Sequence, residues 1–371
     1  MPVGEHLITI YNAEMKPKPK STGRAAPFGV PNRFEKIFVE PDLEQLEHVG
    51  DETPRRVRTE FLPDQAQTLI RENDSPDIPF RFSINPYRGC EHGCAYCYAR
   101  PTHETLGMNA AFDFESKILV KHGAVQHLRR ELNVSSWKGE PIALSGVTDC
   151  YQPVERKLQI TRGLLQVFRE ADQAVMIVTK NALVLRDLDL LAPMAERGLV
   201  RVGLSVTSLD VELTKLLEPR TSTPAARLRA IAELRAADVP VSVMVSPIIA
   251  GLNDHELAAI LSAARQAGAM SAQYTLLRLP HAVAPIFLAW LDQHRPAARP
   301  RIESLIRSTR GGQLNDACFG SRMRGEAAYA ENIRNAFEVF ARKFELHQAL
   351  PPLDTSRFRP PRGADGQRTL F

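Results

Sequence analysis

Three of the five cysteines stand close together, at Cys90, Cys94 and Cys97 in the stretch "GCEHGCAYCYARP" of residues 89–101. Their spacing, three residues and then two, follows directly on a short apolar run, and Gly93 allows the connecting loop to turn sharply. Three thiolates held this closely can converge on one metal centre, and soft sulfur ligands select zinc or an iron–sulfur cluster. The sequence therefore predicts a metal centre at this loop.

Two kinds of metal centre fit the three cysteines. A structural zinc ion needs a fourth ligand, and His92 or His103 could supply it. A 4Fe-4S cube held by three cysteines instead leaves one iron open to a substrate or a cofactor. The two other cysteines, Cys150 and Cys318, are too few to hold a conventional second cluster.

Six short apolar runs of the kind that form buried strands alternate with helical patterns between residues 82 and 280. The runs are "RFSINP", "PIALSGV", "AVMIVTK", "LVRVGLSV", "VPVSVMV" and "AQYTLLRL". Strand, helix, strand at this spacing predicts right-handed βαβ units and a parallel sheet. Since a closed (β/α)8 barrel needs eight units, we expect an α/β fold with an open, partial (β/α)6 barrel.

The helical patterns include residues 158–171, 185–198, 224–239 and 254–268. Pro224 suits the first turn of the third, and Asn253 or Asp254 suits the N-cap of the fourth. After the barrel, residues 284–294 and 325–346 also have helical patterns, and we expect these helices to flank or partly close the barrel opening.

The chain divides into four regions on composition and periodicity. Residues 1–80 are rich in proline, glycine and charge and predict an irregular, basic N-terminal extension, and residues 81–282 predict the barrel. Residues 283–348 predict a helical region, and residues 349–371 predict a flexible tail.

Composition limits the class of protein. Hydrophobic residues make up 44% and charged residues 24% of the 371, which is ordinary for a globular protein. No apolar run is long enough to span a bilayer, and the first residues lack the pattern of a signal peptide, so we expect no membrane association and place the protein in the cytoplasm. A net charge of +4 gives little support for a nucleic-acid partner by itself.

The cysteine motif, read together with the barrel, resembles the signature of the radical S-adenosylmethionine (SAM) superfamily. The pattern CxxxCxYC in "CEHGCAYC" follows the first strand of a six-fold βα repeat. The resemblance implies that Cys90, Cys94 and Cys97 hold a 4Fe-4S cluster whose open iron binds SAM, and that Tyr96 lies near the adenine. It also implies reductive cleavage of SAM to a 5′-deoxyadenosyl radical, with electrons from a flavodoxin or ferredoxin.

Strand ends around the barrel mouth supply the other SAM contacts that this resemblance implies. Residues of "LSGVTD" resemble the segment that binds the SAM amino group, "GLSVTS" offers contacts to the ribose and methionine portions, and "LEPRTS" offers a guanidinium for the SAM carboxylate. The residues concerned are Ser145, Gly146, Thr148, Ser205, Thr207 and Arg220.

The stretches "NPYRGC", "CAYCYARPTHE", "TDCYQPVE" and "EPRTSTPAARL" together are similar to the spore photoproduct lyase-like branch of this superfamily. That resemblance implies a lyase that repairs a DNA lesion, with Cys150 as hydrogen-atom donor and Tyr98 as relay. Cys150 can equally be a small buried side chain of the core. The alternatives are a radical SAM enzyme that modifies tRNA, a peptide or a small metabolite, and a zinc-stabilised nucleic-acid-binding protein.

The last residues, Gln367–Phe371, resemble the peptide that docks into the bacterial sliding clamp. An apolar Leu-Phe pair ends a polar tail that has no fold of its own to pack into. The resemblance implies a role at DNA that is being replicated or repaired.

Overall fold

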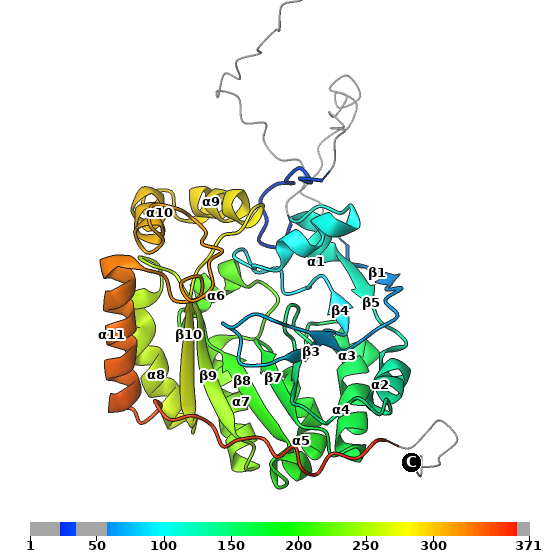
Figure 1. The fold of residues 1–371 in the computed structure, drawn as a ribbon. Coiled ribbons are helices and arrows are strands. Elements are labelled where there is room, and N and C mark those ends of the chain that lie inside the picture. Colours follow the sequence, from blue (N-terminus) through cyan, green and yellow to red (C-terminus); the bar gives the residue numbers. More distant parts are fainter. Residues whose placement is uncertain (1–22, 35–57, 362–371) are drawn as a thin grey trace, which may run out of the picture.

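The computed structural model describes residues 23–34 and 58–361. A seven-stranded sheet forms the centre, with its strands in the order β10, β9, β8, β7, β6, β3, β2 (Figure 1). Its strands are β2 (Arg71–Glu72), β3 (Phe82–Ile84), β6 (Ile142–Leu144), β7 (Val175–Thr179), β8 (Val200–Ser205), β9 (Val241–Ile248) and β10 (Ser271–Leu276). Neighbouring strands from β3 to β10 pair in parallel, and β2 pairs antiparallel with β3.

The six parallel strands are the six apolar runs that the sequence predicts. Most side chains on both faces of these strands are buried or half-buried, which explains why the strands read as apolar runs, and β10, with Gln273 exposed, is the exception. Since β10 and β2 are the two edges of the sheet, the expected open, partial barrel is confirmed.

Helices follow the strands. The helices are α1 (Phe112–Ser116), α2 (Ala124–Leu132), α3 (Glu155–Leu158), α4 (Ile160–Glu170), α5 (Leu188–Ala195), α6 (Val211–Leu217), α7 (Pro224–Ala236), α8 (Leu257–Gln266), α9 (Val283–His294), α10 (Arg299–Ser308) and α11 (Ala327–Lys343). Several of them pack along the outer face of the sheet, whereas α1, α9 and α10 lie at one end of the barrel (Figure 1). None of the helices in the described residues combines the length and apolarity that crossing a membrane requires.

Helix α7 begins as the sequence predicts, and a short 3-10 turn precedes α8. Pro224 is the first residue of α7, and the Thr223 hydroxyl accepts a hydrogen bond from the Ala226 N–H at 3.3 Å. Asn253 is the N-cap of a short 3-10 turn, Asp254–Glu256, that runs directly into α8, and its side chain makes no capping hydrogen bond. The Asn253 amide instead donates to the Thr207 carbonyl at 2.8 Å and so joins two loops at the carboxyl ends of the strands.

A second, three-stranded sheet was not expected from the sequence. It contains β1 (Glu60–Pro63), β5 (Lys117–Val120) and β4 (Tyr87–Arg88), in the order β1, β5, β4. Strand β4 pairs antiparallel with β5, and Cys90 lies two residues after β4. This small sheet therefore fixes the entry to the cysteine stretch, and β1 gives part of the predicted irregular extension a regular structure.

Residues 314–325, which we call the strap, lie against both edges of the open sheet. On the β10 side, the Leu276 N–H donates to the Met323 carbonyl at 2.9 Å. On the β2 side, the Gly320 N–H and the Arg322 guanidinium bind the Asp77 carboxylate at 2.7 and 2.6 Å. The strap thus crosses the opening, a position that the sequence assigned to helices.

Helix α11 flanks the opening at one edge only. It packs on α8 beside β10, where the rings of Phe337 and Tyr274 lie 4.6 Å apart (Figure 1). Helix α10 was not expected from the sequence, and it packs against α9 and α11.

The expectation of a flexible tail from residue 349 is wrong for residues 349–361. This segment runs along the end of the barrel opposite α9 and α10 (Figure 1). The Asp354 N–H donates to the Gly198 carbonyl at 2.9 Å, and the Arg359 N–H donates to the Ala171 carbonyl at 2.8 Å. The segment Gln367–Phe371 lies outside the described residues.

Candidate active site

The cysteine loop, residues 89–99, connects β4 to the next helical turn. Two glycines and a backbone hydrogen bond to Phe114 determine its conformation. Gly89 and Gly93 adopt positive φ angles of 81° and 65°. At Gly93 a Cβ atom would lie 2.8 Å from Cβ of Arg24, so the loop needs glycine there for space as well as for conformation. The Cys90 N–H donates to the Phe114 carbonyl at 2.9 Å.

The three thiols have the chemistry of cluster ligands. Cys90 and Cys94 are buried, Cys97 is half-buried, and none is in a disulfide. Burial raises the pKa of the Cys94 thiol well above its ordinary value. A thiolate at this place therefore requires a compensating positive charge, which the irons of a bound cluster would supply.

The arrangement fits a cluster better than a single metal ion. Within the described residues, no three histidine, cysteine, aspartate or glutamate side chains meet closely enough to chelate one ion. A cube binds each thiolate through a different iron, so its ligands need not converge on one point. Both candidate zinc ligands have other partners: His92 Nδ1 lies 3.4 Å from an Asp149 oxygen, and His103 Nε2 lies 3.0 Å from the Lys117 carbonyl.

The Arg100 side chain stabilises the cysteine loop by binding its backbone carbonyls. Its guanidinium is fully buried and donates to the carbonyls of Gly93 and Cys94 at 3.2 and 2.8 Å. An ion pair of 2.5 Å with Glu115 compensates its charge. Five donors in a rigid fork can bind a carboxylate and backbone carbonyls together, which a lysine could not do in the same geometry.

Tyr96 points its hydroxyl into a buried network and donates to the Glu218 carboxylate. Thr207 donates to the same carboxylate at 2.7 Å, Lys180 Nζ lies 3.5 Å from it, and Arg227 pairs with it. Burial alone raises the pKa of a carboxyl, but the charges of Arg227 and Lys180 outweigh burial and hold the pKa of Glu218 below its ordinary value. The network joins the cysteine loop to the ends of β7 and β8.

Arg220 lies against the cysteine loop. Its guanidinium pairs with Glu91 at 2.8 Å, and its N–H donates to the His92 carbonyl at 3.4 Å. The Glu91 N–H in turn donates to the Gln152 side chain at 2.8 Å. Arg220 is therefore close to the cysteines, as its assignment to SAM requires, and in the structure it binds a carboxylate of the chain itself.

The loop after β6 holds three of the residues assigned to SAM. Ser145 has a φ of 72°, and its hydroxyl accepts a hydrogen bond from the Cys150 N–H at 2.7 Å. The Thr148 hydroxyl donates to the Tyr87 carbonyl at 2.8 Å. The Gly146 carbonyl accepts from the Tyr98 hydroxyl at 2.7 Å, which links this loop to the cysteine loop. Of these three residues, Gly146 is therefore the one that directly contacts the cysteine loop, through Tyr98.

The two residues assigned after β8 are buried. Ser205 ends β8, and its carbonyl accepts from Arg227 at 3.0 Å. Thr207 follows it and belongs to the Glu218 network. Both positions are at the carboxyl ends of the strands, as predicted, and the contact of their hydroxyls with SAM stays a prediction.

The two predicted catalytic residues have opposite environments. Cys150 is fully buried in the main hydrophobic cluster, and burial raises the pKa of its thiol well above the ordinary value. Tyr98 is 45% exposed. The Arg278 guanidinium lies 5.0 Å from the centre of the Tyr98 ring. Cys150 is thus packed in the core, Tyr98 is partly exposed, and the catalytic roles assigned to the two residues stay predictions.

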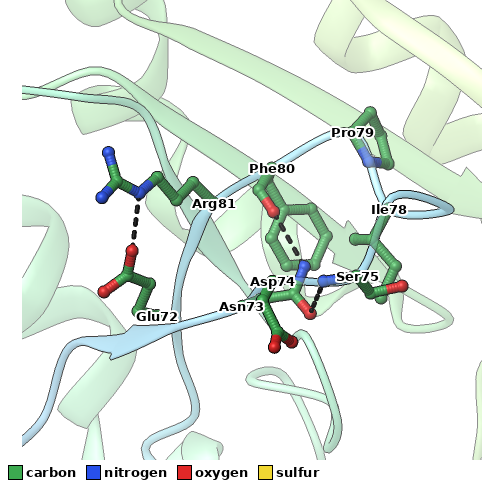
Figure 2. Close-up of a pocket in the computed structure, with 8 residues that line it drawn as sticks. All are labelled: Glu72, Asn73, Asp74, Ser75, Ile78, Pro79, Phe80 and Arg81. Atoms are coloured by element: carbon green, nitrogen blue, oxygen red, sulfur yellow. Dashed lines mark hydrogen bonds and ion pairs between the residues drawn. The ribbon is translucent and has the colours of Figure 1, made fainter.

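A surface hollow of about 430 Å³ lies over the turn between β2 and β3 (Figure 2). Its polar groups bind one another: the Asn73 amide donates to the Phe80 carbonyl at 3.0 Å, and Arg81 pairs with Glu72 at 2.7 Å. The Phe80 ring lies 3.7 Å from the position of a Cβ at Gly146. The turn is therefore one wall of the barrel mouth and not a separate site.

Several residues of the site were missed in the sequence. Lys180 directly follows β7 and Glu218 directly follows α6, whereas Asn181 lies two residues after β7 and Asp149 lies five residues after β6. The Asn181 amide contacts His92 Nε2 at 3.2 Å, opposite Asp149. The available signal was a charged or amide side chain at the end of a buried strand, in "VTKN" and "VTD".

Fold and site together define an open (β/α)6-barrel enzyme whose cysteine loop closes over the carboxyl ends of the strands. Comparison with known proteins gives the family. The model of the Radical SAM superfamily matches residues 84–264. An uncharacterized protein of Mycobacterium tuberculosis is 35% identical over 299 residues, which cover 79% of this chain and 83% of the relative. The chain belongs to the radical SAM superfamily, and its cofactors are a 4Fe-4S cluster and SAM.

Two further comparisons extend the family. An uncharacterized protein of Methanocaldococcus jannaschii is 30% identical over 199 residues, which cover 54% of this chain and 71% of the relative. Spore photoproduct lyase complexed with dinucleoside spore photoproduct has a TM-score of 0.55 at 15% identity, over 76% of this chain and 78% of that one. At this identity the likeness to the lyase shows a shared fold.

Proposed function

We propose that this radical SAM enzyme acts on a lesion in DNA, in the manner of a spore photoproduct lyase. The observation that carries the proposal is the position of Tyr98, an aromatic residue that is 45% exposed and directly follows the last cysteine of the motif. An exposed aromatic ring beside the cluster site suits a substrate that arrives from outside the barrel, such as a base of a nucleic acid. The fold shared with the lyase also supports the proposal.

In this proposal, different residues of the chain hold the cluster, orient SAM and exclude water. Cys90, Cys94 and Cys97 hold the cluster, which when bound supplies the electron that cleaves SAM. The loops after β6 and β8, with Arg220, orient SAM at the carboxyl ends of the strands. Tyr96 and His92 are buried, and they exclude water from the inner side of the cysteine loop.

Tyr98 is assigned as the relay. Its hydroxyl donates to the Gly146 carbonyl, so it lies between the cysteine loop and the loop assigned to SAM. The role of hydrogen donor stays a prediction for Cys150, and its complete burial argues for packing. In the described arrangement, Tyr98 is the more accessible of the two predicted catalytic residues.

The experiment is a reaction of the reconstituted enzyme with SAM, dithionite and DNA that carries methylene-linked thymine dimers. We expect the lesion to be consumed and thymine to be restored, as followed by mass spectrometry. Formation of 5′-deoxyadenosine without any change in this DNA would reject the proposed substrate while leaving the radical SAM assignment in place.

The partners follow from the same proposal. A flavodoxin or ferredoxin supplies electrons to the cluster in the cytoplasm, and Gln367–Phe371 recruits the protein to the bacterial sliding clamp. Deletion of these last residues would remove clamp binding in calorimetry and leave SAM cleavage unchanged. Equal binding by the shortened protein would reject the clamp as partner.

A further inference from the structure

Arg278 lies two residues after β10 at the barrel mouth, and no carboxylate of the described residues forms an ion pair with it. Within the described residues it forms no ion pair or hydrogen bond, and its guanidinium lies over the Tyr98 ring. Arg278 is only partly exposed, and burial lowers the pKa of its guanidinium, an effect to which the charge of Arg322 adds and which the Asp77 carboxylate opposes without reversing it. A half-buried guanidinium without a carboxylate is stabilised by any anion that reaches it.

The strap brings a second arginine, Arg322, and the aromatic ring of Phe319 to the barrel mouth. The buried Arg310 donates to the Leu277 carbonyl at 2.7 Å and to the Arg322 carbonyl at 3.1 Å, so it holds the end of β10 against the strap. The Arg322 guanidinium lies 4.6 Å from the centre of the Phe319 ring. Phe319 is 60% exposed, so its ring is open to a base that stacks on it.

Arg322 and Arg278 differ in what they are free to bind. Arg322 already binds Asp77, and it also donates to the Ser75 hydroxyl. It therefore fixes the strap to the β2–β3 turn, the wall that Figure 2 shows. Arg278 has no such partner among the described residues, so its guanidinium remains available to a ligand.

We propose that Arg278 and Phe319 bind one strand of DNA at the barrel mouth, Arg278 through a backbone phosphate and Phe319 by stacking on a base. An arginine that contacts phosphate beside an exposed ring is the combination by which proteins hold single strands without reading their sequence. The choice of DNA rests on the proposed function, whereas the pairing of an anion site with a stacking ring rests on the geometry of the strap.

The site places the strand relative to the chemistry. The Arg278 guanidinium lies over the ring of Tyr98, and Tyr98 directly follows the cluster ligand Cys97. A phosphate on Arg278 therefore brings the attached nucleotide next to the cysteine loop. Phe319, on the strap, holds the neighbouring base outside the mouth.

The test is the binding of a short fluorescein-labelled single strand of DNA to the reconstituted protein, measured by fluorescence anisotropy over a series of salt concentrations. Arg278→Gln should weaken binding about tenfold, and it should reduce the slope of affinity against salt by about 0.7, the value of one phosphate contact on a single strand. Arg278→Lys should keep the salt slope, because the charge remains.

Phe319→Ala should weaken binding about tenfold without a change in the salt slope, because stacking releases no counterions. Arg229→Gln on α7 and Val339→Ala on α11 are matched controls, since Arg229 is exposed and Val339 is 60% exposed like Phe319. Both should bind as the unchanged protein does. Melting curves establish that each variant is folded.

Unchanged affinity in both Arg278→Gln and Phe319→Ala would overturn the proposed site. Tighter binding of RNA than of DNA of the same sequence, with the same loss in both variants, would overturn the choice of DNA. If the variants lose binding but thymine dimers are never consumed, the proposed function fails and the site stands. If Arg278→Gln repairs the lesion with an unchanged kcat/KM, the site fails and the proposed function stands.

Discussion

The barrel mouth has two sides that use arginine differently. On the side of the cysteine loop, Arg100 and Arg227 are fully buried, and each is paired with a buried carboxylate, Glu115 and Glu218. On the side of the strap, Arg322 is likewise paired with Asp77, but Arg278 is partly exposed and forms no ion pair with any carboxylate of the described residues. Compensated charges fix the positions of loops, whereas an uncompensated charge is available to bind a ligand.

The difference also separates two kinds of effect. A buried ion pair is a weak source of stability as a whole, but loss of one partner leaves the other charge buried and uncompensated. Substitutions on the cysteine side should therefore damage the fold and the cofactor site together. Substitutions on the strap side should change ligand affinity and leave the fold intact.

The largest expected effect is on the cysteine side. Cys94→Ala removes one of three cluster ligands, and we expect the loss of SAM cleavage and of bound iron after anaerobic reconstitution. Production of 5′-deoxyadenosine and iron content are the measurements. A Cys94→Ala protein with undiminished 5′-deoxyadenosine production would refute the role of this loop. Cys318→Ala is the control, because Cys318 is exposed on the strap.

Next is Glu218→Gln, which leaves Arg227 and Lys180 without their shared counter-charge. We expect the free energy of unfolding to fall by about 3–5 kcal/mol, as measured by urea denaturation. The pKa of Glu218 is lowered in the folded state, so this contribution is present at neutral pH and is lost as the pH falls through the folded value. The difference between the two proteins should therefore shrink in strong acid.

The control for Glu218→Gln is Glu212→Gln on α6. Glu212 is 74% exposed in its side chain and lies 4.0 Å from Lys215, and surface pairs of this kind contribute at most about 1 kcal/mol. If the two substitutions cost the same, the buried network does not fix the cysteine loop in the way that we describe.

The sequence predicted the parts of the fold that depend on local pattern. The six parallel strands were found because each contains a short run of buried apolar residues bounded by helical or turn patterns. Strands β4 and β5 were missed because they are short and depend on pairing with each other for their stability. The strap was missed because nothing in its own sequence shows that Asp77 lies beside Arg322.

The same division holds for the site. The three cysteines were found because spacing alone identifies them, and their loop lies at the mouth as the resemblance requires. Glu218 and Lys180 were missed because each, taken alone, looks like a solvated charge at the end of a strand or helix. Only the fold brings them to within 3.5 Å of each other and makes them a buried network.

A smaller effect is expected for Tyr98→Phe, at the boundary between the two sides. The ring that contacts Arg278 remains, and only the hydroxyl that donates to the Gly146 carbonyl is lost. If Tyr98 is the relay, thymine formation should fall about tenfold while SAM cleavage continues. One positioned acid–base group typically contributes a factor of this size or larger. Equal losses in product and in 5′-deoxyadenosine would show that the hydroxyl only positions the loop.

The smallest effect on the reaction is expected for Cys150→Ala. Cys150 is completely buried beside Tyr87 and Tyr151 in the main hydrophobic cluster, and its N–H and carbonyl are bound by Ser145 and Thr161. Replacement by alanine removes one buried sulfur, so we expect a loss of about 1 kcal/mol in the free energy of unfolding. The products of the reaction should not change, because a thiol with no exposed surface cannot reach a substrate that enters at the mouth. Mass spectrometry of the products decides the matter: a new or diverted product in Cys150→Ala would mean that the thiol does donate hydrogen, and that the core opens during turnover to let it do so.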